Sequence, residues 1–124
     1  MFRMADGIDE LQAQLLRTLA SAHRLRIIHL LGAGPCEVNE IAHGLGMNQT
    51  ATSQHLAAMR SVGIVEPLRE GRVVRYRLTD PDILAACALM REVLVRRLSR
   101  LGDLAAAALM PDDATVPSSQ VGQR

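Results

Sequence analysis

Small polar side chains gather on one side of the segment 49–62, and their chemistry matches the edges of nucleic-acid bases. A glutamine amide forms paired hydrogen bonds with adenine, and serine or threonine hydroxyls bind bases or phosphates. If the segment is a helix that turns about 100° per residue, such side chains share an arc of about 140°: Gln49, Thr50, Ser53, Gln54 and Arg60. A helix with small outer groups fits a major groove about 12 Å wide. The pattern therefore predicts a helix that reads double-stranded DNA.

The other side of this segment is suited to packing. Its inner stripe would be Thr52, His55, Leu56 and Met59, so we expect a mainly structural role for His55. Asn48 is placed to cap the helix, where the free amides of the first turn suit a phosphate.

A basic hairpin is predicted directly after this helix. Segments 64–69 and 72–78 alternate with a period of two around a Glu70-Gly71 turn. Pro67 indicates an edge strand, because proline cannot donate to a strand ladder. From 60 to 77, five arginines face two glutamates, a local balance of +3. Arg72 at the tip and Arg75 on its strand would supply cations to a DNA backbone or minor groove.

Apolar spacings of three and four predict helices before and after these elements. The first covers about 8–20, the second begins after Ser21 and ends at 32–35, and the third covers about 37–44. Inner positions are expected in the second helix (Leu25, Ile28 and His29, with Leu31 as a further candidate) and in the third (Val38, Ile41, Leu45).

The last helix is predicted to begin at a Thr79 or Asp80 cap, with Pro81 in its first turn, and to run to about Met110. It carries one long apolar stripe, more than a lone hairpin could cover: Ile83, Cys87, Met90, Leu94, Leu98 and Leu101. We expect a flexible segment at 1–7, a single domain at 8–110 and a disordered, Pro- and Ser-rich tail at 111–124. The fold class is mainly α with a small β-hairpin, in the order of a winged helix-turn-helix.

Four stretches together resemble the ArsR/SmtB type of winged helix-turn-helix repressor. They are LASAHRLRII at 19–28, VNEIA at 38–42, MNQTATSQHL at 47–56, and GIV with REGRVVRYRL at 63–65 and 69–78. The resemblance covers about 15–98. It implies a homodimeric repressor whose first and last helices pair across the dimer, and which an inducer releases from a DNA operator.

The metal sites of such repressors are not intact in this sequence. A thiolate site would need Cys-x-Cys around 37–39, where only Cys36 is near. A zinc site on the last helix could use Asp80 and Asp82, but the later ligand positions hold Val93, Arg96 and Arg97. We therefore expect no metal site and no cofactor.

Cys36 and Cys87 remain as candidate sensors. A thiol pair could respond to oxidants or reactive sulfur, or could bind a soft metal. Alternatively, Cys87 packs as a small apolar residue and the regulator has neither a metal nor a thiol inducer.

The remaining composition narrows the function class. The 124 residues suit one domain, the formal net charge is +1, and no segment is apolar and long enough for a signal peptide or membrane span. Two cysteines favour a reducing cytoplasm over a disulfide scaffold. No phosphate-binding glycine loop or catalytic triad pattern occurs, so we expect a DNA-binding protein and not an enzyme.

Overall fold

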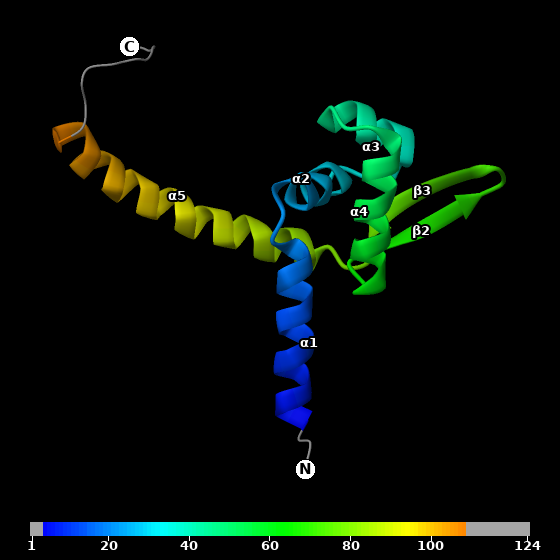
Figure 1. Cartoon of the computed structure of the whole chain (residues 1–124), viewed down its shortest axis with the longest axis horizontal. Coiled ribbons are helices and arrows are strands. Elements are labelled where there is room, and N and C mark those ends of the chain that lie inside the picture. The colour runs from blue at the N-terminus through cyan, green and yellow to red at the C-terminus, as the bar shows by residue number, and fades with distance from the viewer. Residues whose placement is uncertain (1–3, 109–124) are drawn as a thin grey trace. The chain divides into compact units, whose positions relative to one another are not determined.

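The computed structural model describes residues 4–108, with side chains over 7–104. The helices are α1 (Met4–Leu19), α2 (Ala22–Leu31), α3 (Val38–Leu45), α4 (Gln49–Ser61) and α5 (Asp82–Ala108), and the strands are β1 (Cys36–Glu37), β2 (Val65–Glu70) and β3 (Val73–Leu78). Two compact units are distinguished, one up to Cys87 and one from Ala88 onward. In the first unit, α2, α3 and α4 lie together and the β2–β3 hairpin projects beside α4 (Figure 1).

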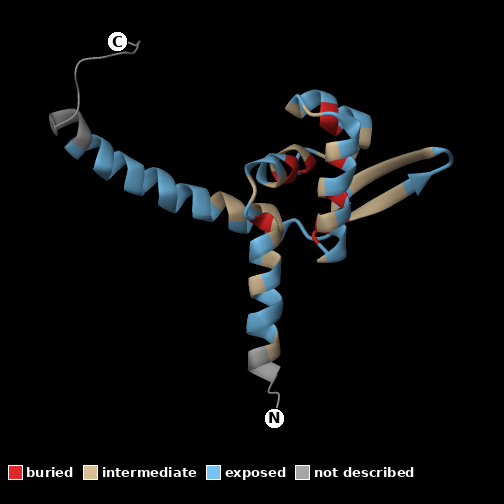
Figure 2. Cartoon of the chain, viewed as in Figure 1, coloured by how far each residue is buried: buried red, intermediate tan, exposed pale blue. Residues whose placement is uncertain are grey.

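The hydrophobic core of the first unit lies where α2, α3 and α4 meet the base of the hairpin. Its fully buried side chains include Ile27 and Ile28 of α2, Ile41 of α3, Leu56 and Met59 of α4, and Ile64 and Val65. Figure 2 shows these buried positions, in red, on the facing sides of the helices. Burying such side chains stabilises the fold by roughly 1.5–3 kcal/mol each, before the entropy of ordering is subtracted.

Local capping fixes where two of these helices begin. The Ser21 hydroxyl accepts a hydrogen bond from the Arg24 backbone N–H, and the Asn48 Oδ1 accepts one from the Ala51 N–H at 2.7 Å. Both caps are confirmed. Between α3 and α4 the chain reverses at Gly46, whose φ of 65° suits a residue without a Cβ.

The sheet has three strands, because the short strand β1 adds to the predicted two-stranded hairpin. Its order is β1-β3-β2, with Cys36 opposite Tyr76 and Glu37 opposite Arg75. Glu70 pairs with Val73, so the turn is Gly71-Arg72 and not the predicted Glu70-Gly71. Gly71 has a φ of 64°, which places glycine within the turn. Pro67 lies on edge strand β2, as predicted.

The prediction for the inner side of α2 was partly wrong. Ile28 and Leu31 are buried, but Leu25 is 37% exposed and Ile27 is fully buried in its place. α1 begins at Met4, four residues before the predicted start at Ile8, and α5 begins at Asp82, whose N–H binds Asp80 Oδ1 at 2.9 Å. Asp80 therefore binds the first residue of α5. Pro81 precedes the helix, so its predicted place in the first turn was wrong. The predicted tail at 111–124 lies outside the described residues.

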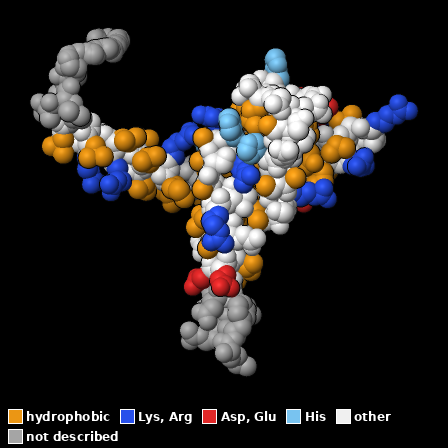
Figure 3. Space-filling view, viewed as in Figure 1, with side chains coloured by type: hydrophobic (Ala, Val, Ile, Leu, Met, Phe, Trp, Pro, Cys, Tyr) orange, Lys and Arg blue, Asp and Glu red, His pale blue; other side chains and the backbone are white. Residues whose placement is uncertain are grey.

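The long helix α5 is exposed over most of its length. Ile83, Leu84 and Cys87 pack against the core of the first unit, whereas Met90, Leu94, Leu98 and Leu101 of the predicted stripe are each at least half exposed. Hydrophobic side chains line this helix in Figure 3, interspersed with arginines. Within the described part of the chain, none of the helices has the length and apolarity to cross a membrane.

Candidate DNA interface

The outer face of α4 is fully available to a ligand. All five polar side chains predicted to form it are exposed: Gln49, Thr50, Ser53, Gln54 and Arg60. The Asn48 side chain caps the helix, so the first turn presents its remaining backbone N–H groups at the same end as Gln49 and Thr50. This end of α4 therefore offers hydrogen-bond donors and acceptors with no bulky apolar group among them.

The inner face of α4 holds the helix in place. Thr52, Leu56 and Met59 are at most 1% exposed, and His55 is half-buried. The Thr52 hydroxyl donates to the Asn48 carbonyl at 2.9 Å, which satisfies the one buried polar side chain found in the described part of the core. The predicted inner stripe is confirmed, and it presents the outer face from a rigid support.

The hairpin β2–β3, which we call the wing, ends in a basic tip. Arg72 lies exposed in its two-residue turn, and Figure 3 shows basic side chains extending from the wing. At the base of the wing, the Thr79 hydroxyl donates to the Gly63 carbonyl at 2.6 Å. The wing therefore leaves the core from a closed base that lies next to the C-terminal end of α4.

Arg75, which we predicted as a free cation of the wing, is paired within the chain. Its guanidinium donates to Glu70 Oε1 at 2.6 Å and lies 3.9 Å from Glu37 Oε2. All three side chains are more than a third exposed, so the pairs add little stability. The two carboxylates nevertheless offset the charge that Arg75 could offer to a phosphate. Arg77 is similarly paired, with Glu66 at 2.9 Å.

Arg69 is a basic residue that the sequence reasoning did not select. It lies opposite Val74 and, with a strand period of two, shares a sheet face with the buried Val65. That face of β2 is the one that packs on the helices, whereas the carboxylate-paired arginines occupy the other. Within the described residues, no carboxylate lies within 4 Å of Arg69. The alternation along β2 was the signal that could have identified it.

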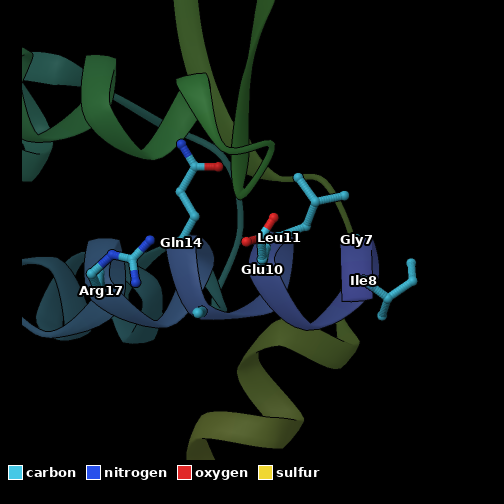
Figure 4. Close-up of a pocket in the computed structure, with 7 residues that line it drawn as sticks. Gly7, Ile8, Glu10, Leu11, Gln14 and Arg17 are labelled. Atoms are coloured by element: carbon cyan, nitrogen blue, oxygen red, sulfur yellow. The ribbon is translucent and has the colours of Figure 1, made fainter. Parts of the chain in front are cut away.

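Apolar side chains are also exposed along α1. Ile8, Leu11 and Leu16 are each at least 45% exposed, although α1 is anchored at its end by the buried Leu19. Figure 4 shows a hollow along this helix, with Ile8, Leu11 and Gln14 projecting from it. Exposed leucines at these spacings are typical of a helix face that a partner covers.

The two candidate sensor thiols are half-buried and unpaired. Cys36 lies in β1 with its thiol 3.6 Å from the Gly34 carbonyl, and Cys87 lies in the first turns of α5. Burial raises the pKa of both thiols, and for Cys36 the nearby Glu40 carboxylate raises the pKa further while Arg75 partly opposes it. Within the described residues, no cluster of three or more His, Cys, Asp or Glu side chains could hold a metal.

We expect both thiols to react slowly with iodoacetamide at neutral pH. Because the thiolate is the reacting form and the pKa of each thiol is raised, the alkylation rate should still be rising above about pH 8.5, the value for a free cysteine. Mass spectrometry of samples quenched over time would follow each cysteine separately. A rate that levels off near neutral pH at either residue would contradict this expectation.

The N-terminal unit matches a known regulatory family in sequence. Residues 21–66, which run from the cap of α2 into β2, match the model of the bacterial regulatory protein, arsR family. The chain is 35% identical over 123 residues to the HTH-type transcriptional regulator Rv0324 of Mycobacterium tuberculosis, covering 98% of this chain and 54% of that one. It thus spans about half the length of that relative.

Solved structures agree with the sequence matches. The homodimeric winged helix-turn-helix DNA-binding domain of Mb0332 from Mycobacterium bovis superposes with a TM-score of 0.74 at 33% identity, covering 81% of this chain and 93% of that one. Rv0081 of M. tuberculosis superposes with a TM-score of 0.69 at 34% identity, covering 75% and 94%. In sequence, Rv0081 is 35% identical over 77% of this chain and 84% of its own. The predicted winged helix-turn-helix is confirmed, and the chain belongs to the ArsR family of bacterial regulatory proteins.

Proposed function

We propose that this chain binds a duplex DNA operator as a homodimer and represses transcription, without catalysing a reaction. The observation that carries the proposal is the outer face of α4, where five polar side chains are exposed on a helix anchored by three buried ones. In winged helix-turn-helix proteins the second helix of the motif lies in the major groove. The family relationship and the homodimeric Mb0332 domain support the same assignment.

Within this proposal, each element of the interface has a separate task. Gln49, Thr50, Ser53 and Gln54 read base edges, while Asn48 and the first turn of α4 receive a phosphate. Arg72 and Arg69 contact the backbone or minor groove from the wing. Arg60 and Arg75 complete the predicted contacts, with Arg75 weakened by its two carboxylate neighbours.

The second copy is proposed to cover the exposed apolar faces of α1 and α5. Isologous dimers bury the same surface on both subunits, and a dimer places two reading helices on the two halves of an operator. Most of the large apolar side chains that are exposed among the described residues lie on α1 and α5. Covering them removes apolar surface from water, which stabilises the dimer by roughly 25 cal/mol for each Å² buried.

We also propose that an inducer releases the protein from its operator. The state of the two thiols affects which inducers could react with them. Oxidation, sulfur transfer and soft-metal binding all require thiolates, and the pKa of both Cys36 and Cys87 is raised. The raised pKa lowers the thiolate fraction at neutral pH, and the proposal includes three kinds of inducer: a thiol reagent, a soft metal that displaces the thiol protons, or a ligand that acts on neither cysteine. The free cysteines fit the reducing cytoplasm that we propose as its compartment.

The test is binding to a duplex from the region upstream of the protein's own gene, measured at several salt concentrations. Each phosphate contact releases counterions, so the affinity should fall steeply as salt rises. We expect Arg72→Ala to weaken binding to all duplexes alike and to reduce the salt slope by about one. Arg75→Ala is the matched control in the same wing and should change the slope less, because the charge of Arg75 is already offset.

Two results would contradict the proposal. One is an affinity for the duplex that does not depend on salt. The other is a protein that does not bind any duplex although it is folded and dimeric.

A further inference from the structure

One arginine joins three helices of the first unit. The guanidinium of Arg24, on α2, donates from Nε to His55 Nδ1 on α4 at 3.0 Å. The same guanidinium donates from a terminal nitrogen to the Thr18 carbonyl, in the last turn of α1, also at 3.0 Å. Figure 3 shows histidine and arginine side chains lying together near the C-terminal end of α1.

Both ends of this link are fixed by local structure. The Arg24 backbone N–H is held by the Ser21 cap, so the side chain starts from a defined position. The Thr18 carbonyl is among the last carbonyls of α1, which have no partner within a helix, and a cation is favoured at that end of the helix dipole. Arg24 therefore satisfies a group that the fold would otherwise leave to water.

The contact with His55 requires a particular protonation state. A guanidinium has donors only, so His55 Nδ1 must be unprotonated to accept its hydrogen bond. Burial lowers the pKa of His55, and the neighbouring Arg24 and His23 charges lower it further. The His23 ring, on α2, lies 5.6 Å from the His55 ring. The environment of His55 thus favours the neutral form that the hydrogen bond needs.

We propose that Arg24 is a positioning residue for DNA recognition, holding α4 in register with the end of α1 through His55. The inference rests on the proposed function, because it explains how the outer face of α4 is held in position to bind DNA. His55 lies on the inner side of α4, among the residues that anchor the helix. Because α1 also carries apolar side chains offered to the second copy, the same link connects the dimer surface to the reading helix.

The test compares three variants by operator affinity, dimer mass and thermal midpoint. Arg24→Met keeps an unbranched side chain as far as the position of Nε but removes all its donors, and His55→Leu removes the acceptor. His55→Asn is the matched control, because its Oδ1 lies near the position of Nδ1 and can still accept from Arg24. We expect Arg24→Met and His55→Leu to weaken operator binding about tenfold or more, and His55→Asn to stay within about threefold of wild type.

Two further readouts separate positioning from general stability. If the residues act through one contact, the double variant Arg24→Met/His55→Leu should bind about as weakly as either single variant. Because the pKa of His55 is lowered, the contact should persist at about pH 6.5, near the pKa of a free histidine, and protonation should break it and weaken operator binding by wild type as the pH falls further. His55→Asn should lack this loss, and both proteins keep His23 and Arg24, the charged or titratable groups that face His55.

The outcomes are distinguishable. Wild-type protein that binds no duplex contradicts the proposed function itself. Wild-type protein that binds while all three variants match it overturns the role of Arg24. His55→Asn binding as weakly as His55→Leu, with both dimeric, also overturns it. If His55→Leu does not fold, Arg24→Met and the pH comparison decide.

Discussion

Leu94→Glu is expected to convert the dimer to a monomer and, with it, to lower operator affinity by at least about a hundredfold. Leu94 lies in the middle of the exposed stripe of α5 and is 54% exposed in the single chain. In an isologous dimer the substitution places two carboxylates at the interface, one from each copy. An unpaired buried charge costs about 3–5 kcal/mol, which exceeds what one lost leucine contact contributes.

A matched control lies on the same helix. Ser99→Glu adds the same charge about half a turn from the stripe, where no partner is proposed, and should leave the dimer intact. Sedimentation equilibrium over a range of protein concentrations would give the dissociation constant for each variant. If Leu94→Glu remains as dimeric as Ser99→Glu, α5 does not form the interface and the proposed dimer is wrong.

Local sequence signals determined much of the first unit. The caps at Ser21 and Asn48, the inner stripe of α4 and the edge position of Pro67 all depend on residues within a few positions of one another. Each follows from helix or strand periodicity, or from the hydrogen bonds of a single side chain. The same periodicity placed the five exposed polar residues on the outer face of α4.

Features that depend on distant residues were missed. β1 is a strand only because Cys36 and Glu37 pair with β3, about forty positions away, and two residues carry no periodicity of their own. Leu25 was assigned to the core because a helical wheel cannot tell which side of a short, largely apolar helix meets its neighbours. The pairing of Arg75 with Glu37 likewise depends on the three-stranded sheet.

The link from Arg24 to His55 shows the same limit within the candidate site. Its members are 31 positions apart and come from different helices, so neither residue's spacing indicates the contact. The sequence correctly placed His55 on the inner side of α4 and predicted a structural role for it. Only the packing of α2 against α4 shows that His55 binds Arg24. Because of this contact, His55 is a candidate determinant of DNA affinity.

Ser53→Glu should abolish operator binding, with an expected loss of at least about a hundredfold, while the fold and the dimer are retained. Ser53 is exposed in the middle of the reading face, and the described structure gives its hydroxyl no partner whose loss would destabilise α4. A carboxylate at that position would enter a groove bordered by two rows of phosphates, and like charges brought together at an interface cost several kcal/mol.

The control is again Ser99→Glu, which changes the net charge by the same amount but lies on α5. Fluorescence anisotropy with the labelled operator would measure both affinities, and circular dichroism would confirm that each variant keeps its helices. Because the two proteins carry the same total charge, a general loss of attraction to DNA affects both alike. A large loss confined to Ser53→Glu therefore places the operator against the outer face of α4, whereas equal affinities would place it elsewhere on the molecule.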